Sequence, residues 1–339
     1  MNGAQSLLST MVANGVTTCF MNPGTSEMHF VAALDDVPDV RGVLCLFEGV
    51  ASGAADGFGR VTGTPAATLF HLGPGLGNAF ANLHNARRAH TPVLNVVGDH
   101  ATYHTRFDAP LDTDVASIAA ALEGWYRRTA RADDVAGDAA AAILASYGPP
   151  GRVATLVLPA DSSWSPLSGP SRAGVVRPPR RAGVATEVVE DVAAALRTRC
   201  TTLLLGGAAM RRPGLLAAAR IATATGCTVV HETFPAIMDR GAGVPAFDRL
   251  NYLGEAAIAQ LAGSEVLVLA GAPSPVSFFA YPGLPSDLVP EGCEVVVLAD
   301  TALDVVAALE GVADALGAPP ASARDAGSRP ERPTGALDT

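Results

Sequence analysis

Apolar residues along the chain form short runs that alternate with longer, alanine-rich stretches. The runs in the first half predict strands, which we expect at residues 16–21, 43–47, 66–70, 93–97 and 153–158. The stretches between them have helical spacing, and we expect helices at residues 26–34, 48–61, 77–89 and 134–147. Strands that alternate with helices are typical of a parallel sheet covered by helices on both faces. The pattern therefore predicts an α/β fold.

A second alternating set follows in the second half of the chain. Its expected strands are 202–205, 227–231, 265–270 and 294–298, and its expected helices are 186–197, 215–225 and 302–316. Between the two sets the sequence is rich in Pro, Ser, Gly and Arg without periodicity, as in extended connections. We therefore expect two doubly wound parallel-sheet domains, at 1–165 and 185–317, joined by a linker at 166–184. Residues 318–339 have too few apolar side chains to pack and are expected to be a disordered tail or a linker.

Composition and charge narrow the range of partners. The chain has 339 residues, of which 49% are apolar and 17% charged, and its formal net charge is −10. No basic stripe stands out, so neither nucleic acid nor a membrane is an expected partner, and a small molecule is favoured. The start of the chain does not resemble a signal peptide, and the uncharged stretch 266–286 contains four prolines. We therefore expect a cytoplasmic protein.

The chain contains no lysine, since all 23 basic residues are arginines. This excludes a pyridoxal phosphate Schiff base, a Walker A phosphate loop and a Ser-Lys dyad, each of which needs an amine. The five cysteines form no C-x-x-C pair and are expected to be buried, reduced thiols. The histidines between residues 84 and 104 lack an accompanying carboxylate motif, so we expect no metal ligands.

Polar or glycine-rich segments follow four of the expected strands. These segments are Asn22-Pro23-Gly24-Thr25, Glu48, the stretch from His71 to Asn78, and Gly98-Asp99-His100. Because ligands bind at the carboxyl ends of parallel strands, the four segments together favour a binding site at one edge of the first sheet. Any one of them is equally explained by the turn chemistry of Gly, Pro and Asn.

Glu48 is the leading candidate for acid-base chemistry, because it follows an apolar run and opens a helix of small residues. A carboxyl held there is expected to have a raised pKa, although Glu48 is also explained as a helix-starting residue that the helix dipole favours. His71 at the end of the third strand is equally explained as a rim histidine. The G-x-G-x-G spacing after His71 is a weak signal for a phosphate loop, because Pro74 has no amide to donate. Gly206-Gly207 is a similarly weak signal, because glycines at this point are equally explained by a strand-to-helix turn.

Three segments together resemble a known family. They are N-P-G-T-S-E at 22–27, L-F-E-G-V-A-S-G-A-A-D-G-F-G-R at 46–60 and H-L-G-P-G-L-G-N at 71–78. They are similar to the N-terminal pyrimidine-binding domain of thiamine diphosphate enzymes, in the branch of acetolactate synthase large subunits and benzoylformate decarboxylases. The second domain resembles the central domain of these enzymes. The resemblance covers residues 1 to 316.

The resemblance implies thiamine diphosphate as cofactor and a 2-oxo acid as substrate. Glu48 would hydrogen-bond the cofactor's aminopyrimidine and move a proton, and Thr25 and His71 would face the substrate. Acetolactate synthases also hold FAD in the central domain, but Gly206-Gly207 alone does not support FAD in this chain. The implied cofactor-binding residues are Asn22, Pro23, Gly24, Thr25, Glu48, Gly73, Pro74, Gly75 and Asn78. Acetolactate synthases usually have a small residue in place of His71, and benzoylformate decarboxylases have a histidine where this chain has Phe278 and Phe279. The 2-oxo acid is therefore left open.

The family's diphosphate-binding domain is not recognisable in the sequence, because no G-D-G motif is present. In that domain this motif and a later N-N hold Mg²⁺ and the diphosphate. The expected function is therefore the pyrimidine-binding and central part of a 2-oxo-acid decarboxylase or carboligase. The alternative is a catalytically inactive remnant or regulatory partner of such an enzyme. Expected assemblies are a homodimer, a homotetramer, or a complex with a separate diphosphate-binding subunit.

Overall fold

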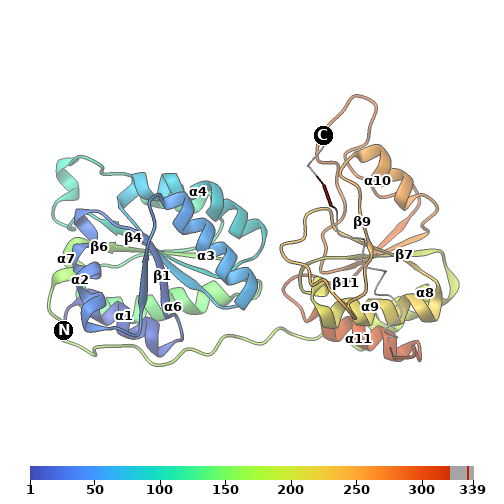
Figure 1. The fold of residues 1–339 in the computed structure, drawn as a ribbon, viewed down its shortest axis with the longest axis horizontal. Coiled ribbons are helices and arrows are strands. Elements are labelled where there is room, and N and C mark those ends of the chain that lie inside the picture. Colours follow the sequence, from blue (N-terminus) through green and yellow to red (C-terminus); the bar gives the residue numbers. More distant parts are fainter. Residues whose placement is uncertain (321–333, 336–339) are drawn as a thin grey trace. The chain divides into compact units, whose positions relative to one another are not determined.

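The computed structural model describes residues 1–320 and 334–335 and divides into two compact units, Met1–Arg180 and Arg181–Thr339 (Figure 1). Each unit has a parallel β-sheet with helices on both faces. The expected fold class is therefore confirmed. Most of the expected tail at 318–339 lies outside the described residues.

The first sheet has six strands in the order β2-β1-β3-β4-β6-β5, all parallel. The strands are β1 (Thr18–Asn22), β2 (Arg41–Leu44), β3 (Ala66–Phe70), β4 (Val93–Asp99), β5 (Trp125–Arg128) and β6 (Val153–Pro159). The sequence did not predict β5, because two of its four residues are arginines. These arginines lie at the sheet edge and pair with acids of the fold: Arg127 with Asp138 and Arg128 with Asp99, each at 2.8 Å.

Two apolar clusters cover the two faces of the first sheet. The helices are α1 (Gly3–Ala13), α2 (Met28–Asp36), α3 (Glu48–Thr62), α4 (Leu72–Arg88), α5 (Val115–Ala120), α6 (Val135–Tyr147) and α7 (Ala160–Trp164), with 3-10 turns η1 (Thr25–Glu27), η2 (Thr105–Phe107) and η3 (Ala132–Asp134). Helices α1, α2 and α6 pack on one face, and α3 and α4 on the other. Helix α1 was not predicted, although Asn2 and Gln5 form a reciprocal capping box at its start.

The glycine-rich segment after His71 is helical, which corrects the expectation of a loop up to residue 76. Helix α4 begins at Leu72, whose positive φ of 53° turns the chain directly from strand into helix. Pro74 lies in the first turn, where a missing N–H breaks no helical hydrogen bond. Strand β2 also ends earlier than expected, at Leu44, and Leu46 is 96% exposed. Both corrections concern the edge that carries the candidate site.

The start of the expected linker packs along the first unit. Pro166 pairs with Asn2, and the Val176 amide donates to the Asn14 side chain at 2.7 Å. The amides of Ser168 and Gly169 both donate to Asp133. The division between the units, after Arg180, lies inside the segment 166–184, whose extent as a linker stays a prediction.

The second sheet has five parallel strands in the order β11-β10-β7-β8-β9. Its elements are α8 (Thr186–Thr198), β7 (Thr201–Leu205), η4 (Gly207–Met210), α9 (Arg212–Thr225), β8 (Thr228–His231), β9 (Asp248–Arg249), α10 (Gly254–Leu261), β10 (Val266–Ala270), β11 (Glu294–Ala299) and α11 (Val305–Ala315). Helices α8, α9 and α11 pack on one face and α10 on the other (Figure 1). In the part of the chain that the structure describes, no helix is long and apolar enough to cross a membrane.

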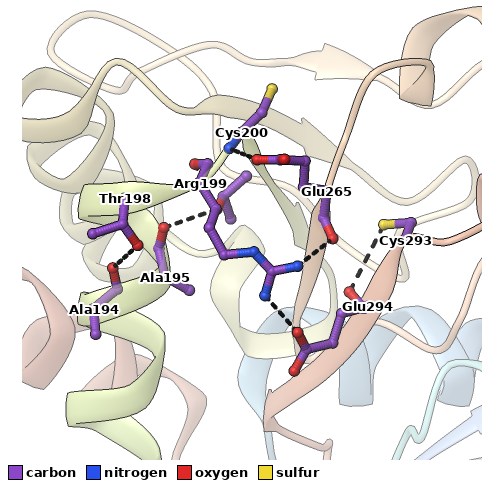
Figure 2. Close-up of polar contacts among 9 residues, drawn as sticks. Ala194, Ala195, Thr198, Arg199, Cys200, Glu265, Cys293 and Glu294 are labelled. Atoms are coloured by element: carbon purple, nitrogen blue, oxygen red, sulfur yellow. Dashed lines mark hydrogen bonds and ion pairs between the residues drawn. The ribbon is translucent and has the colours of Figure 1, made fainter.

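Arg199 joins the starts of three strands of the second sheet (Figure 2). Its guanidinium pairs with the Glu294 carboxylate at the start of β11 and donates to the Glu265 carbonyl before β10. Cys200, just before β7, is exposed, so the expectation that the cysteines are buried is wrong for this residue. Strand register places Cys200 and Cys293 on opposite sides of Glu265, about two strand spacings apart, which is too far for a disulfide.

Candidate functional site

The carboxyl ends of β2, β1 and β3 bring the candidate residues to one edge of the first sheet. These strands are neighbours, so the residues that follow them are also neighbours. Glu48 follows β2, the segment from Pro23 follows β1, and His71 follows β3. The edge carries two groups of side chains, one around Glu48 and one around His71.

Glu48 is the first residue of α3 and is only 9% exposed. The Asn78 side-chain amide, from α4, donates to Glu48 Oε2 at 3.1 Å. A Cβ built on Gly75 would lie 3.3 Å from Glu48 Oε1. The carboxyl group therefore lies directly beside Gly75 at the start of α4. The structure therefore brings three of the expected cofactor-binding residues together.

The start of α3 is fixed by further hydrogen bonds. The Ser52 hydroxyl donates to the Glu48 carbonyl at 2.9 Å, and the Asn82 side chain in α4 donates to the Gly49 carbonyl at 2.6 Å. Glu48 also has the position of a helix-starting acid, where the helix dipole favours its charge. Its contacts with α4 are additional to that role.

Glu27 is the partner of His71, and the sequence analysis did not single it out. Its side chain is almost fully buried, and Oε2 lies 2.8 Å from His71 Nδ1. The same oxygen accepts the Gly24 amide at 2.7 Å. Burial raises the pKa of Glu27, and the Gly24 amide and His71 act against this increase. The sequence signal was present in the motif N-P-G-T-S-E, but a glutamate at the start of a helix is usually exposed.

Two glycines make room for Glu27 and for its partner His71. A Cβ on Gly98 of β4 would overlap with Glu27 Oε1, and that oxygen has no hydrogen-bond partner among the described residues. A Cβ on Gly24 would likewise collide with the His71 ring. Glu27 and Gly24 therefore fix the orientation of His71.

The Glu27 contact decides which nitrogen of His71 is available. An ionised Glu27 requires the proton on Nδ1, which leaves Nε2 as an acceptor in the neutral ring and as a donor in the charged ring. The ring is partly exposed, with 23% of its side-chain surface accessible. His71 can therefore accept or donate a proton at Nε2 while Nδ1 holds it in place.

The other expected site residues have different surroundings. The Asn22 side chain donates to the Cys45 carbonyl at 2.8 Å and so joins the ends of β1 and β2. A Cβ on Gly73 would collide with Thr113, which explains the absence of a side chain there. Pro23 is half-buried and Pro74 is exposed. Thr25 is exposed and lines a neighbouring pocket.

The carboxyl edge of the second sheet has its own polar and aromatic features. The Gly207 amide donates to Glu232 Oε1 at 3.0 Å, so a carboxylate already occupies the amide that a phosphate would need. Phe278 and Phe279 belong to a group of exposed aromatic rings, with ring centroids 4.6 Å apart. Phe234 and Tyr252 extend this group. The Gly207 contact removes the phosphate-binding feature that the sequence suggested in this domain.

Known proteins share both the sequence and the fold of this chain. Residues 1–121 match the family described as thiamine pyrophosphate enzyme, N-terminal TPP binding domain. A candidate acetolactate synthase large subunit of Mycobacterium tuberculosis, IlvX, is 58% identical over 99% of this chain. Over residues 1–121 the chain is therefore similar to the N-terminal domain of thiamine pyrophosphate-dependent enzymes. A benzoylformate decarboxylase of Pseudomonas aeruginosa is 35% identical over 48% of this chain and 30% of its own length.

Solved structures of the thiamine pyrophosphate family show the same architecture. A candidate thiamin diphosphate-dependent enzyme from Mycobacterium smegmatis has a TM-score of 0.80 and 26% identity, over 94% of this chain and 63% of its own. The 4-hydroxybenzoylformate decarboxylase of Rhodococcus jostii RHA1 has a TM-score of 0.79 and 23% identity, over 100% of this chain and 65% of its own. The chain spans 64% of the length of IlvX.

Proposed function

We propose that the chain supplies the pyrimidine-binding and central part of a thiamine diphosphate-dependent enzyme that decarboxylates or ligates 2-oxo acids. The names of the relatives support this class of substrate. The observation that carries the proposal is the buried carboxyl of Glu48, which faces Gly75 and Asn78 at the sheet edge.

The residues around Glu48 fit an aminopyrimidine ring. A planar heterocycle that gains or loses a proton needs a carboxyl group within hydrogen-bond distance. Gly75 brings no side chain up to Glu48 Oε1, while the Asn78 side-chain amide donates to the other oxygen. Bound thiamine diphosphate would supply the stabilisation of the carbanion formed from the substrate. The proposed binding residues are those from Asn22 to Thr25, Glu48, and those from Gly73 to Asn78.

Each proposed catalytic residue has a distinct task. Glu48 would move a proton between Oε1 and the pyrimidine ring of the bound cofactor, which is general acid-base chemistry by a buried carboxyl. His71 presents Nε2 to the substrate, and a 2-oxo acid offers that nitrogen a carbonyl and a carboxylate oxygen. Glu27 is a positioning residue, because it acts through His71.

The test compares Glu48→Gln with a matched variant, Glu187→Gln. Glu187 is an exposed first-turn glutamate of α8, so it shares only the helix-dipole role with Glu48. Both variants are joined to the diphosphate-binding domain of a relative, in cis or in trans, and hydrogen-deuterium exchange at C2 of the bound cofactor is followed by NMR. Glu48→Gln is expected to slow exchange by about 10² to 10⁴-fold, and Glu187→Gln is expected to leave it unchanged.

Thermal melts separate the proposal from a purely structural role. A dipole role alone would cost about 0.3 to 1 kcal/mol of stability in both variants and would leave exchange unaltered. Unchanged exchange in Glu48→Gln would therefore refute the assignment of Glu48. Normal folding and assembly without any exchange in the wild-type complex would instead favour an inactive partner subunit.

A further inference from the structure

A pocket opens at the same edge of the first sheet, next to the group of side chains around His71. Its volume is about 280 Å³. Three segments form it: the turn that leads into α2, the segment after β4, and α7. The side chains that matter for its chemistry are Thr25, His29, His100, Tyr103, His104 and Trp164. Neither Glu48 nor His71 lines this pocket.

The side chains that line the pocket can donate hydrogen bonds, and none of them is an aspartate or a glutamate. Three imidazoles, two hydroxyl groups and a phenol line it, and no carboxylate is among the lining residues. The nearby acids have other partners. Asp161 accepts both the Thr102 amide, at 2.9 Å, and the Thr102 hydroxyl, and Asp99 pairs with Arg128 at 2.8 Å. The lining therefore favours an anion over a cation.

Trp164 supplies an aromatic surface to the pocket lining. The Trp164 indole lies 5.4 Å from the His29 ring, centroid to centroid. The ring of His104 lies 5.8 Å from that of Phe107, and the Arg106 guanidinium lies 4.6 Å above the Phe107 ring. A planar group can pack against Trp164, and the Arg106 guanidinium, which lies outside the pocket lining, favours a negative charge nearby.

A metal ion is a poorer occupant for this pocket. Three imidazoles could in principle bind one, but over residues 1–320 and 334–335 no group of three or more His, Cys, Asp or Glu side chains is arranged to hold a metal. In addition, His100 Nε2 already lies 3.0 Å from the Pro110 carbonyl. The imidazoles are therefore better placed as donors to an anion.

We propose that this pocket binds a small planar carboxylate, such as a single aromatic ring with one carboxyl group. The carboxylate accepts hydrogen bonds from His29 and His104, and the ring lies against Trp164. The volume, slightly below the roughly 300 to 1,000 Å³ of pockets for drug-sized ligands, suits a molecule of one ring. The pocket shares Thr25 with the residues proposed for the cofactor, whereas His29, His104 and Trp164, which carry this proposal, are not among those residues.

The experiment uses the fluorescence of Trp164 in the isolated chain. Trp125→Phe leaves Trp164 as the only tryptophan, because the sequence contains two. The probe is benzoate, and the controls are benzamide, which keeps the ring without the charge, and acetate, which keeps the charge without the ring. We expect benzoate to saturate with a Kd of about 1 mM or lower and to bind at least about ten-fold more tightly than either control.

Histidine variants locate the site. His29→Gln and His104→Gln should each weaken benzoate binding by about five-fold or more, whereas His84→Gln, on the exposed surface of α4, should not. All three side chains are exposed, so folding should be preserved, and a thermal melt checks this. Benzoate binding that does not saturate, that equals benzamide binding, or that weakens equally in His84→Gln would overturn the proposal. None of these results affects the Glu48 exchange experiment, because that experiment follows a different residue and ligand.

Discussion

A buried acid that contacts a histidine lies behind the candidate site. Glu27 has one oxygen shared by His71 and the Gly24 amide and a second oxygen against Gly98 without a hydrogen-bond partner among the described residues. Burial disfavours the ionised form of Glu27, and the Gly24 amide, His71 and the backbone of Glu27 itself offset only part of that cost. Stability should therefore depend on pH through this one residue.

Glu27→Gln should change that pH dependence. The folded-state pKa of Glu27 is raised, so the folded chain binds more protons than the unfolded chain just above the ordinary pKa of glutamate. The stability that the Glu27 carboxyl contributes is fully present below the ordinary pKa of glutamate, and it is lost as pH rises through the folded-state pKa. Relative to Glu27→Gln, the wild type should therefore lose stability as pH rises from mildly acidic to neutral.

Urea unfolding at several pH values measures this difference. The control is Glu187→Gln, whose exposed carboxyl should give a profile parallel to that of the wild type. A difference between wild type and Glu27→Gln that stays constant with pH would show that Glu27 is not the titrating group.

At the scale of elements, the start of α4 determines the shape of the candidate site. Two of its glycines differ in their surroundings: Gly75 faces Glu48 and Phe70, whereas a Cβ on Gly77 would have nothing within 4 Å among the described residues. Gly77→Ala should raise the free energy of unfolding by about 0.5 to 1 kcal/mol, because alanine has the higher helix propensity. Gly75→Ala should raise the free energy of unfolding by less, because its Cβ would lie 3.3 Å from both Glu48 Oε1 and Phe70 Cβ.

Urea unfolding of the two alanine variants, compared with wild type, tests this contrast. Gly73→Ala extends the series in the opposite direction, since its Cβ would collide with Thr113 and should cost about 1 to 3 kcal/mol. If Gly75→Ala and Gly77→Ala raise the free energy of unfolding equally, the space beside Glu48 is wider than the structure indicates.

The same helix shows how far the sequence could be interpreted. Strand β3 was predicted with its observed bounds because all five of its residues are buried and apolar or small. The start of α4 was missed because Gly and Pro favour turns, and only the conformation of Leu72 starts the helix there. The burial of Glu27 was missed because it depends on Gly98, a contact between residues far apart in the chain. Local pattern predicts elements, whereas contacts between strand ends have no local signal.

At the scale of the whole molecule, an apolar surface beside Glu48 suggests self-association. Leu44, Leu46, Phe47 and Val50 are all exposed, and β2 is an edge strand of its sheet. Exposed apolar groups next to an unpaired strand edge are typical of interfaces. We expect the chain to form at least a dimer through this surface.

Leu46→Asp should shift the chain towards the monomer, by about ten-fold or more in the dissociation constant, as measured by analytical ultracentrifugation. Leu46 is 96% exposed, so the fold of the monomer should not change. Val175→Asp, an exposed position after Pro166, is the matched control and should leave assembly unaltered. A wild-type chain that is monomeric at all concentrations would contradict the expectation.

The segment that follows β6 also limits how this chain can be rearranged by gene fusion. Pro166 pairs with Asn2, and Val176 bonds to Asn14, so the start of the apparent connector belongs to the folding unit at the N-terminus. A recombination breakpoint near residue 165 would remove these partners from α1 and from Asp133. Exchange of the second unit between relatives is therefore least disruptive when the junction lies close to Arg180, after the last of these contacts.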